Sequence, residues 1–517
     1  MSFSRIRSAQ TVGITSRLID IEVDITNGLH AFSIVGLPDK AVEEARDRVS
    51  AALKNSGFVS PKQQNQKLVI SLAPADLKKE GTVLDLPISI AYLAARGDLD
   101  VPLEHKLFVG ELSLDGSIRP IRGALSITLA ARRALFDEIY LPAANAEEAS
   151  LVPGIRILPV STLKELVEHL RAGASETSDT THKIEPVPHT RPKSAVGIRA
   201  SVDLTDIKGQ ASAKRALMIA AAGGHNLGLW GPPGTGKTML AKALAGILPP
   251  LSVKEVIEVT AIHSVCGALE GGIVSEPPYR APHHTASYVS VIGGGTTPRP
   301  GEATLAHRGV LFLDEFPEFD RRVIESLREP LEEGSISVAR ARGSETFPAN
   351  FMLIAAMNPC PCGNYATENP CTCTPGSLER YRRKLSGPIV DRIDMWVFVD
   401  RVDHKALTDT SRHGKTSDEA RNSIIVARRR QKKRFHDAAL RGISLNSNMS
   451  ARNILSLSKL AKDAEILLES AAGTLDISPR SFHRLIKVAR TIADLDDSPR
   501  IETTHMSEAL SYRKRDS

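Results

Sequence analysis

The sequence is poor in cysteine and aromatic residues and contains no long apolar run. Five cysteines among 517 residues are too few for a disulfide framework. Aromatic residues make up 4% of the chain, which argues against a stacking platform for single-stranded nucleic acid. No stretch reaches the roughly 18 apolar residues of a transmembrane helix. The segment from Met1 to Arg7 also lacks the apolar run that follows the basic residues of a secretory signal. We therefore expect a cytoplasmic protein without a membrane partner.

The small net charge of +6 is concentrated in one segment. Residues 421–441 hold eight basic side chains and one acidic one, a charge of +7, so the rest of the chain carries −1. The basic residues are Arg421, Arg428, Arg429, Arg430, Lys432, Lys433, Arg434 and Arg441. Such a run either binds phosphate groups electrostatically or forms the solvated face of a helix, and composition alone leaves both interpretations open.

The pattern along the chain predicts two folded regions and a linker. Residues 1–170 alternate strand-like and helix-like stretches, such as the apolar strand 68–72 and the helix 86–95. Residues 171–200 are rich in Ser, Thr, Pro and His without periodicity, which predicts a flexible linker. Residues 201–405 are of α/β type, and residues 406–517 show no strand signal, which predicts a helical domain that contains the basic segment.

A phosphate-binding loop follows the short predicted strand 227–230. The motif G-x-x-x-x-G-K-[ST] is filled by Gly231, Pro232, Pro233, Gly234, Thr235, Gly236, Lys237 and Thr238. Its glycines let backbone N–H groups close around phosphate oxygens, and the helix that follows adds its positive dipole end. Lys237 is expected to reach the β- and γ-phosphates of ATP, and Thr238 to bind Mg²⁺.

Two further predicted strands end in polar residues suited to phosphate chemistry. Asp314 and Glu315 follow the apolar run 310–313, and Asn358 follows the run 351–356. We expect Asp314 to hold Mg²⁺ and Glu315 to act as the base that activates the attacking water. Asn358 would orient that water or contact the γ-phosphate, although Asn-Pro is also a common turn sequence.

Longer motifs carry a resemblance to a known family. The stretches 279–287 (YRAPHHTAS), 292–295 (IGGG), 300–302 (PGE) and 305–315 (LAHRGVLFLDE) are similar to the magnesium-chelatase-like branch of the AAA+ ATPases. Within that branch the chain resembles the YifB/ComM family, which the N-terminal stretches 34–39 (IVGLPD) and 51–58 (AALKNSGF) also match. The resemblance implies an AAA+ core with a helical C-terminal lid, preceded by an α+β domain similar to the Lon protease, which has the ribosomal S5 domain 2-like fold.

The resemblance also assigns roles to four arginines. Arg392 corresponds to the arginine finger that a neighbouring subunit supplies, with a local ion pair to Asp391 and Asp394 as the alternative. Arg480 corresponds to the second sensor at the phosphates, with a helix-surface arginine as the alternative. Arg340 and Arg342 lie near the tip of an inserted hairpin and either contact a polyanion in a central pore or remain solvated edge-strand charges. We expect His283 and His284 to have structural or loop roles.

Four of the five cysteines fall between residues 360 and 373. Cys360, Cys362, Cys371 and Cys373 form two C-x-C pairs, tighter than the usual C-x₂-C spacing of zinc sites. The family carries a zinc-finger-like cluster here, which implies Zn²⁺. Reduced thiols without a metal and a redox disulfide remain alternatives.

The resemblance of the first 170 residues to the Lon-like domain does not extend to its catalytic dyad. The segment 83–87 offers no serine and the segment 122–126 no lysine where the nucleophile and its base should stand. We therefore expect a docking or DNA-binding platform and no protease.

Three functions are compatible with these features. The resemblance implies a hexameric ATP-driven helicase that performs branch migration on recombination intermediates during natural transformation, with branched or single-stranded DNA bound by the pore hairpin and by Arg428 to Arg434. The alternative is a chelatase-motor-like ATPase that remodels proteins and does not act on DNA. A scaffold that uses ATP only for assembly is disfavoured by the presence of Glu315, Asn358, Arg392 and Arg480.

Overall fold

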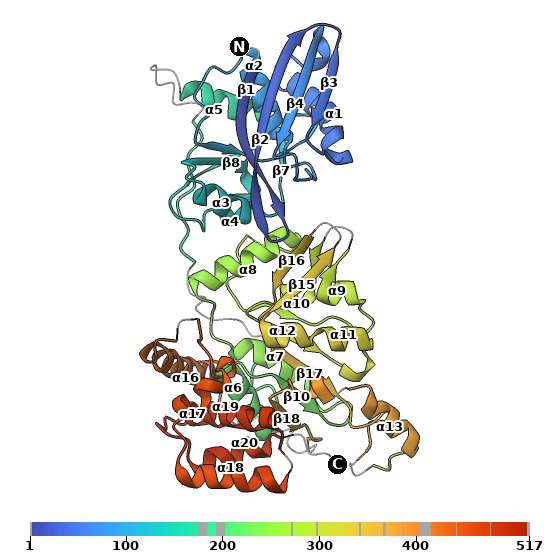
Figure 1. The fold of residues 1–517 in the computed structure, drawn as a ribbon, viewed down its shortest axis with the longest axis vertical. Coiled ribbons are helices and arrows are strands. Elements are labelled where there is room, and N and C mark those ends of the chain that lie inside the picture. Colours follow the sequence, from blue (N-terminus) through green and yellow to red (C-terminus); the bar gives the residue numbers. More distant parts are fainter. Residues whose placement is uncertain are drawn as a thin grey trace. The chain divides into compact units, whose positions relative to one another are not determined.

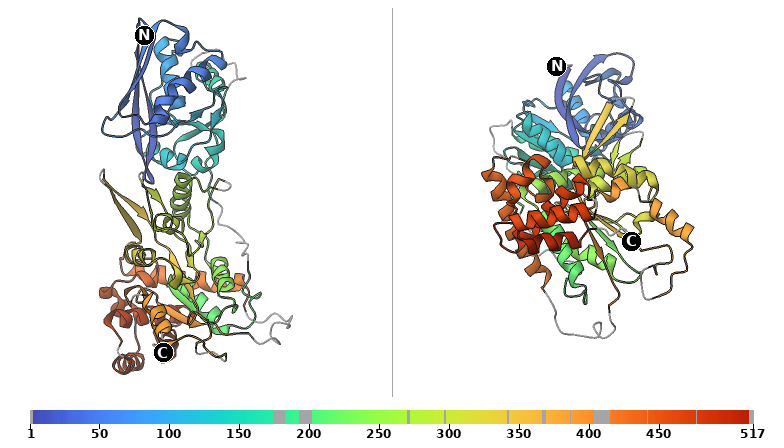
Figure 2. Two further views of the ribbon diagram at one scale, coloured as in Figure 1. Left: turned by 90° about the vertical axis from the view of Figure 1, so that its right-hand side faces the viewer. Right: turned by 60° about the horizontal axis from the view of Figure 1, so that its bottom comes forward.

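The computed structural model describes residues 3–173, 183–192, 202–269, 272–295, 298–340, 343–365, 369–385, 387–402, 415–440, 442–475 and 477–513. The chain divides into two compact units (Figures 1 and 2). The first unit comprises Met1–Lys193 and Val253–Ser275, and the second comprises Ser194–Ser252 and Glu276–Ser517. Within the described ranges, no helix combines the length and the apolar character needed to cross a membrane.

The first unit is a seven-stranded mixed sheet covered by helices. The strand order is β3-β4-β2-β1-β5-β8-β9, with the β1–β2 and β2–β4 pairs antiparallel and the β3–β4, β1–β5, β5–β8 and β8–β9 pairs parallel. The strands are β1 (Phe3–Val12), β2 (Thr15–Asn27), β3 (Ala31–Val35), β4 (Gln66–Ala73), β5 (Lys106–Phe108), β8 (Glu138–Pro142) and β9 (Arg156–Val160), with a small hairpin of β6 (Glu111–Leu112) and β7 (Ile118–Arg119). The helices are α1 (Lys40–Asn55), α2 (Asp85–Arg96), α3 (Ala124–Arg133), α4 (Ala146–Ala149), α5 (Leu163–Ala172) and α8 (Val253–Cys266).

Alternation along the strands gives this sheet two buried faces. Leu68, Ile70 and Leu72 of β4 point into the core formed with α1, α2 and α5. Ala9 of β1 belongs to a second core that contains residues of α3. Helix α8, although it follows the phosphate-loop helix in the sequence, packs on α3, and Ser264 Oγ accepts a hydrogen bond from the Gly123 N–H at 3.0 Å. The predicted strand 68–72 and helix 86–95 are both present.

The predicted linker 171–200 begins within a helix, since α5 extends to Ala172, and its described residues 183–192 pack on the first unit. Val187 pairs with Ile157 of β9, and Ile184 is buried. The Ile184 N–H donates to His169 Nδ1 at 2.9 Å. This stretch therefore extends the first unit, because its backbone groups and one apolar side chain find partners there. The remaining positions 174–182 and 193–200 of the predicted linker lie outside the described residues.

The second unit is built on a five-stranded parallel sheet of order β11-β14-β17-β10-β18. Its strands are β10 (Leu227–Trp230), β11 (Tyr279–Arg280), β14 (Val310–Leu313), β17 (Met352–Met357) and β18 (Met395–Phe398), with two hairpins, β12 (Gly293–Gly294) with β13 (Arg299–Pro300) and β15 (Ser335–Arg340) with β16 (Gly343–Pro348). Its helices are α6 (Ala211–Gly223), α7 (Lys237–Ile247), α9 (Tyr288–Ile292), α10 (Glu302–Leu305), α11 (Arg321–Ser326), α12 (Arg328–Glu333), α13 (Pro375–Arg383), α14 (Gly387–Val390), α16 (Ser417–Asp437), α17 (Ala451–Ser458), α18 (Lys462–Thr474), α19 (Pro479–Leu495) and α20 (Thr503–Ser511).

Continuous apolar runs form the centre of this sheet, as the sequence predicts. Strand β14 is buried at every position, because Phe312 faces one core and Leu311 and Leu313 face the other. The first core also contains residues of α6, α7, α16 and α19, so the C-terminal helices share a core with the sheet. Among the described residues of 415–513 the regular secondary structure is helical. The predicted α/β core with a helical C-terminal region is thus confirmed.

A buried ionic network joins the C-terminal helices. Asp494 of α19 is 1% exposed and forms ion pairs with Arg434 of α16 and, at 3.0 Å, with Arg490. Asn446 Nδ2 donates a hydrogen bond to the same carboxylate at 2.9 Å. Removing one partner of such a network leaves uncompensated charge in the interior.

We predict that Asp494→Ala destabilises the protein by about 3–5 kcal/mol, because Arg434 and Arg490 lose their shared buried anion. Urea unfolding of the full chain measures this change. Asp437→Ala removes a carboxylate that is 63% exposed at the end of α16 and serves as the control. We expect the control to change stability by less than about 0.5 kcal/mol. Equal effects of the two substitutions would contradict a stabilising role of the network.

Candidate nucleotide-binding site

The predicted phosphate loop connects β10 to α7 at the carboxyl edge of the parallel sheet. Gly234 and Gly236 have φ values of +78° and +88°, in the left-handed region that favours glycine. Gly231 lies so close to β18 that a Cβ atom there would approach the Val399 carbonyl oxygen within 2.1 Å. Helix α7 begins at Lys237, so its unpaired N–H groups face the loop, as in anion-binding helix starts.

Lys237 ties this loop to the end of the neighbouring strand. Its Nζ donates to the carbonyl oxygens of Gly231 at 2.8 Å and Pro232 at 2.7 Å, and to Asn358 Oδ1 at 3.2 Å. Burial lowers the pKa of Lys237, and the nearby Asp314 carboxylate opposes that shift. The structure therefore brings together two residues that lie 121 positions apart in the sequence.

Thr238 and Asp314 present oxygen atoms at the same edge. Thr238 Oγ1 donates to Asp314 Oδ2 at 2.8 Å, and Asp314 Oδ1 accepts the Glu315 N–H at 2.9 Å. A hydroxyl and a carboxylate are the hard oxygen donors that Mg²⁺ prefers. This donor set fits a magnesium ion held beside the phosphates of a nucleotide.

Glu315 contacts a residue whose importance the sequence interpretation missed. Its φ of +51° is unusual for a residue with a side chain, and its carboxylate is 54% exposed. His284 Nδ1 lies 2.9 Å from Glu315 Oε2. The expectation that His283 and His284 have structural or loop roles does not include this contact to the candidate base. The contact depends on the parallel pairing of β11 with β14, which no local sequence pattern indicates.

The two predicted arginines lie at the opposite, amino edge of the sheet. Arg392 and Arg480 line a cleft of about 580 Å³ together with Asn226, Phe351 and Asp394, which directly precede β10, β17 and β18. Both guanidinium groups meet one carboxylate, that of Glu332 near the end of α12, with 2.7 Å from Arg392 Nη2 to Glu332 Oε1. The hydrogen bond from Arg392, followed by that from Arg480, lowers the pKa of Glu332.

Arg392 does not form the alternative ion pair with Asp391 and Asp394, because its carboxylate partner is Glu332. Asp394 instead pairs with Arg484 at 3.2 Å and accepts the Asn226 N–H at 2.9 Å. Arg392 donates from Nη1 to the Pro388 carbonyl at 2.6 Å and is 8% exposed. Arg480 pairs with Glu332 at the amino edge, whereas the phosphate loop of the same chain lies at the carboxyl edge.

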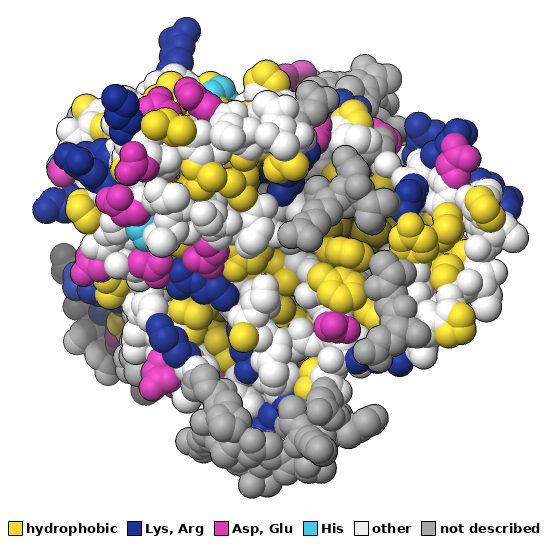
Figure 3. Space-filling model, turned by 90° about the horizontal axis from the view of Figure 1, so that it is seen from below, with side chains coloured by type: hydrophobic (Ala, Val, Ile, Leu, Met, Phe, Trp, Pro, Cys, Tyr) yellow, Lys and Arg dark blue, Asp and Glu magenta, His cyan; other side chains and the backbone are white. Residues whose placement is uncertain are grey.

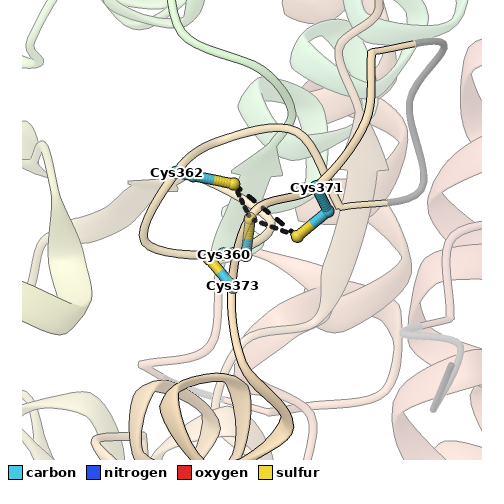
Figure 4. Close-up of side chains that lie close together, drawn as sticks. All are labelled: Cys360, Cys362, Cys371 and Cys373. Carbon is cyan, nitrogen blue, oxygen red and sulfur yellow. Dashed lines mark hydrogen bonds between the residues drawn. The ribbon is translucent and has the colours of Figure 1, made fainter.

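The four clustered cysteines lie close together, and dashed lines in Figure 4 join the sulfurs of Cys360, Cys362 and Cys371. The Sγ of Cys360 lies 3.3 Å from that of Cys362 and 3.8 Å from that of Cys371, and the sulfurs of all four lie within 4.8 Å of one another. Zn–S bonds of about 2.3 Å in a tetrahedron place the sulfurs about 3.8 Å apart, so the cluster fits such an ion. Backbone N–H groups of Asn364 and Thr372 lower the pKa of the Cys362 thiol to about 5, which favours the metal-binding thiolate.

Residues 421–437 of the basic segment belong to α16, and several of their arginines bond to other parts of the chain, whereas Arg441 lies outside the described residues. Arg428 donates to the Ala221 carbonyl at 2.7 Å, Arg430 donates to the Asp494 carbonyl at 2.6 Å, and Arg434 pairs with the buried Asp494 carboxylate. Other basic side chains of this helix are exposed, among them Lys432 and Lys433. On the face shown in Figure 3, basic side chains are interspersed with acidic ones. The side chains of the two predicted hairpin contacts, at positions 340 and 342, lie outside the described part.

This fold and site define a phosphate-loop ATPase of the AAA+ class. The parallel sheet places a phosphate loop, an acidic strand end and a polar strand end at one edge. Comparison with known proteins agrees. The family described as magnesium chelatase, subunit ChlI, matches residues 203–407, a second ChlI family matches 21–145, and the ChlI C-terminal family matches 414–513.

Similar curated proteins include relatives that match nearly the whole chain and one that matches a part of it. Competence protein ComM of Haemophilus influenzae is 42% identical, covering 99% of this chain and 98% of the relative. The uncharacterized protein YifB of Escherichia coli is 42% identical over 100% of this chain and 98% of the relative. The magnesium-chelatase 67 kDa subunit of Chlorobaculum tepidum is 30% identical over 31% of this chain and 23% of its own length. The chain belongs to the YifB/ComM family of magnesium-chelatase-like AAA+ ATPases.

We predict that Glu315→Gln lowers the ATP hydrolysis rate by at least about 100-fold, because the amide cannot accept the proton of the attacking water. Nucleotide binding, measured with a fluorescent ATP analogue, should be unchanged. Glu318→Gln is the control, since this carboxylate three residues further on pairs with Lys384 at 2.6 Å. If Glu315→Gln retained the hydrolysis rate of the unaltered protein, Glu315 would not be the base.

Proposed function

We propose that the chain is an ATP-driven motor that forms a hexameric ring in the cytoplasm. Each ring would hydrolyse ATP at sites shared by neighbouring subunits and drive branch migration of recombination intermediates during natural transformation. A relative of nearly equal length is named a competence protein, which supports this biological setting.

The location of Arg392 and Arg480 is the observation that carries the proposal. Their cleft is bordered by residues at the amino edge of the sheet, whereas the phosphate loop follows the carboxyl end of β10. The four residues of β10 span about 13 Å, so the two edges are well separated. Arginines at one edge and phosphates at the other meet when subunits associate head to tail, and such interfaces form a ring when the rotation from one subunit to the next closes.

The residues of one such site have distinct roles. Lys237 would neutralise phosphate charge, and Asn358 would orient the γ-phosphate or the attacking water. Thr238 and Asp314 would hold Mg²⁺, which supplies positive charge to the β- and γ-phosphate oxygens. Glu315 would take the proton of the water, with its carboxylate oriented by His284. Arg392 and Arg480 of the neighbouring subunit would stabilise the charge that develops on the transferred phosphoryl group.

We predict that two inactive variants regain ATP hydrolysis when mixed. Lys237→Ala destroys the phosphate loop of a subunit, and Arg392→Ala destroys its contribution to the neighbour. Some interfaces of a mixed ring would combine an intact loop with an intact arginine, so the mixture should hydrolyse ATP although neither variant does so alone. A mixture of the double variant with either single variant is the control. If the mixture of the two single variants is as inactive as each variant alone, the site is not shared between subunits.

The exposed cations of α16 are the candidates for DNA binding in this proposal. We predict that changing Arg429, Lys432 and Lys433 together to Gln weakens binding to a four-way DNA junction. The slope of log K against the logarithm of the salt concentration should also become shallower, by about one unit for each phosphate that the variant no longer neutralises. Fluorescence anisotropy over a salt series measures this slope.

The control for this triple variant changes Arg452, Lys459 and Lys462 to Gln. These substitutions remove the same charge from positions of the same helical region outside α16. Equal slopes for both triple variants would contradict the assignment of DNA binding to α16.

Two observations favour a second function. Three arginines of the predicted DNA-binding set are bonded to other parts of the same chain, and part of the chain is similar to a magnesium-chelatase subunit. The alternative is therefore an ATPase that remodels a protein partner and does not act on DNA. ATP hydrolysis and strand exchange measured with forked or four-way DNA separate the two functions. Stimulation and exchange support the DNA motor, and the absence of both supports the alternative.

Two further assignments are part of the proposal. The cysteine cluster would hold Zn²⁺ through Cys360, Cys362, Cys371 and Cys373. The first unit would be a Lon-like docking or DNA-binding domain without protease activity. In support of this, Asp85 of the segment 83–87 is 1% exposed and forms a structural ion pair with Arg48 at 2.7 Å.

A further inference from the structure

The cysteine cluster lies beside the phosphate loop and contacts it through Gly363. This glycine, in the loop between Cys362 and Cys371, has a φ of +81°. A Cβ atom there would lie 2.6 Å from Pro233 Cδ, so the cysteine loop and the phosphate loop are in close contact at this point. The main chain of the cysteine loop at Gly363 thus packs directly against the phosphate loop at Pro233.

A second connection runs through the end of strand β17. Cys360 follows Asn358 by two residues, and Asn358 Oδ1 accepts from Lys237 at 3.2 Å. On the other side of the cluster, Cys373 directly precedes Thr374, whose side chain caps the start of α13. Tyr381 of that helix is 7% exposed and donates from its hydroxyl to the Asn358 carbonyl at 3.1 Å. Both ends of the cysteine loop therefore reach the residue that contacts the phosphate-loop lysine.

The loop has little apolar burial of its own. Among the described residues of 361–373, only Gly363 is buried, and the Tyr365 N–H donates to Cys360 Sγ at 3.2 Å. A segment with so small a core gains most of its order from bonds between its thiolates and a metal, since metal-binding free energy acts as folding free energy in such segments. Loss of the metal would release the Gly363 contact and the start of α13 together.

We propose that metal binding by the four cysteines and nucleotide binding at the phosphate loop are energetically coupled through Gly363, Asn358 and Tyr381. This inference rests on the proposed nucleotide and zinc sites and adds a regulatory link between them. Coupling of two equilibria is reciprocal. A metal-loaded cluster therefore strengthens ATP binding, and bound ATP strengthens retention of the metal.

The test measures zinc release from the full-length, zinc-loaded protein with a chromogenic chelator, with and without a non-hydrolysable ATP analogue and Mg²⁺. We expect the nucleotide to slow release by at least about fivefold, the lower end of common coupling strengths. Tyr381→Phe removes one hydroxyl and should reduce this protection. Tyr365→Phe makes the same chemical change in a tyrosine of the cysteine loop, whose ring lies under Arg382 at 5.4 Å, and should leave the protection intact.

The reverse direction provides an independent readout. Cys362→Ser should lose zinc and weaken binding of a fluorescent ATP analogue at least about fivefold, whereas Cys266→Ser should change neither. If the protein binds zinc and hydrolyses ATP, but release is equally fast with and without nucleotide, the coupling is overturned and the proposed function stands. If it binds no nucleotide or no zinc, the corresponding proposed site fails, and the coupling fails with it. Because Tyr381→Phe and Tyr365→Phe retain all four cysteines, the comparison holds even if Cys362→Ser does not fold.

Discussion

The nucleotide site depends on the hydrogen bonds that Lys237 and Thr238 make to the ends of two other strands. Lys237 donates to Asn358 after β17, and Thr238 donates to Asp314 after β14. Three segments that are distant in the sequence are thereby fixed at one edge of a parallel sheet. The surrounding packing serves this arrangement, because strands buried on both faces hold their ends at defined positions.

The direction of the parallel strands also determines where a second set of charges can act. The carboxyl edge holds the phosphate loop and the acidic pair, and the amino edge holds Arg392 and Arg480, which share Glu332. If these two sets of residues belong to one catalytic site, as proposed, the chain would complete that site by association with a second copy. The cysteine cluster is also positioned by the sheet, because it follows β17, and its Gly363 contacts Pro233 of the phosphate loop.

The sequence was informative where local pattern determines structure. The runs 227–230 and 310–313 coincide with β10 and β14. Partners that come from tertiary packing were not predictable in this way. The charge count of residues 421–441 gives no sign that Arg434 is bonded to Asp494, and the pair of histidines gives no sign that His284 reaches Glu315. Likewise, no local pattern indicates that α8 belongs to the first unit, because its partner α3 lies more than a hundred residues earlier.

The central claim is that ATP hydrolysis requires contact between subunits. The most direct test measures the ATPase rate per chain across a dilution series, with the mass of the assembly determined at each concentration. A site shared between subunits predicts a rate near zero for the monomer that rises to a plateau as rings form. A rate per chain that stays constant from monomer to full assembly would contradict it.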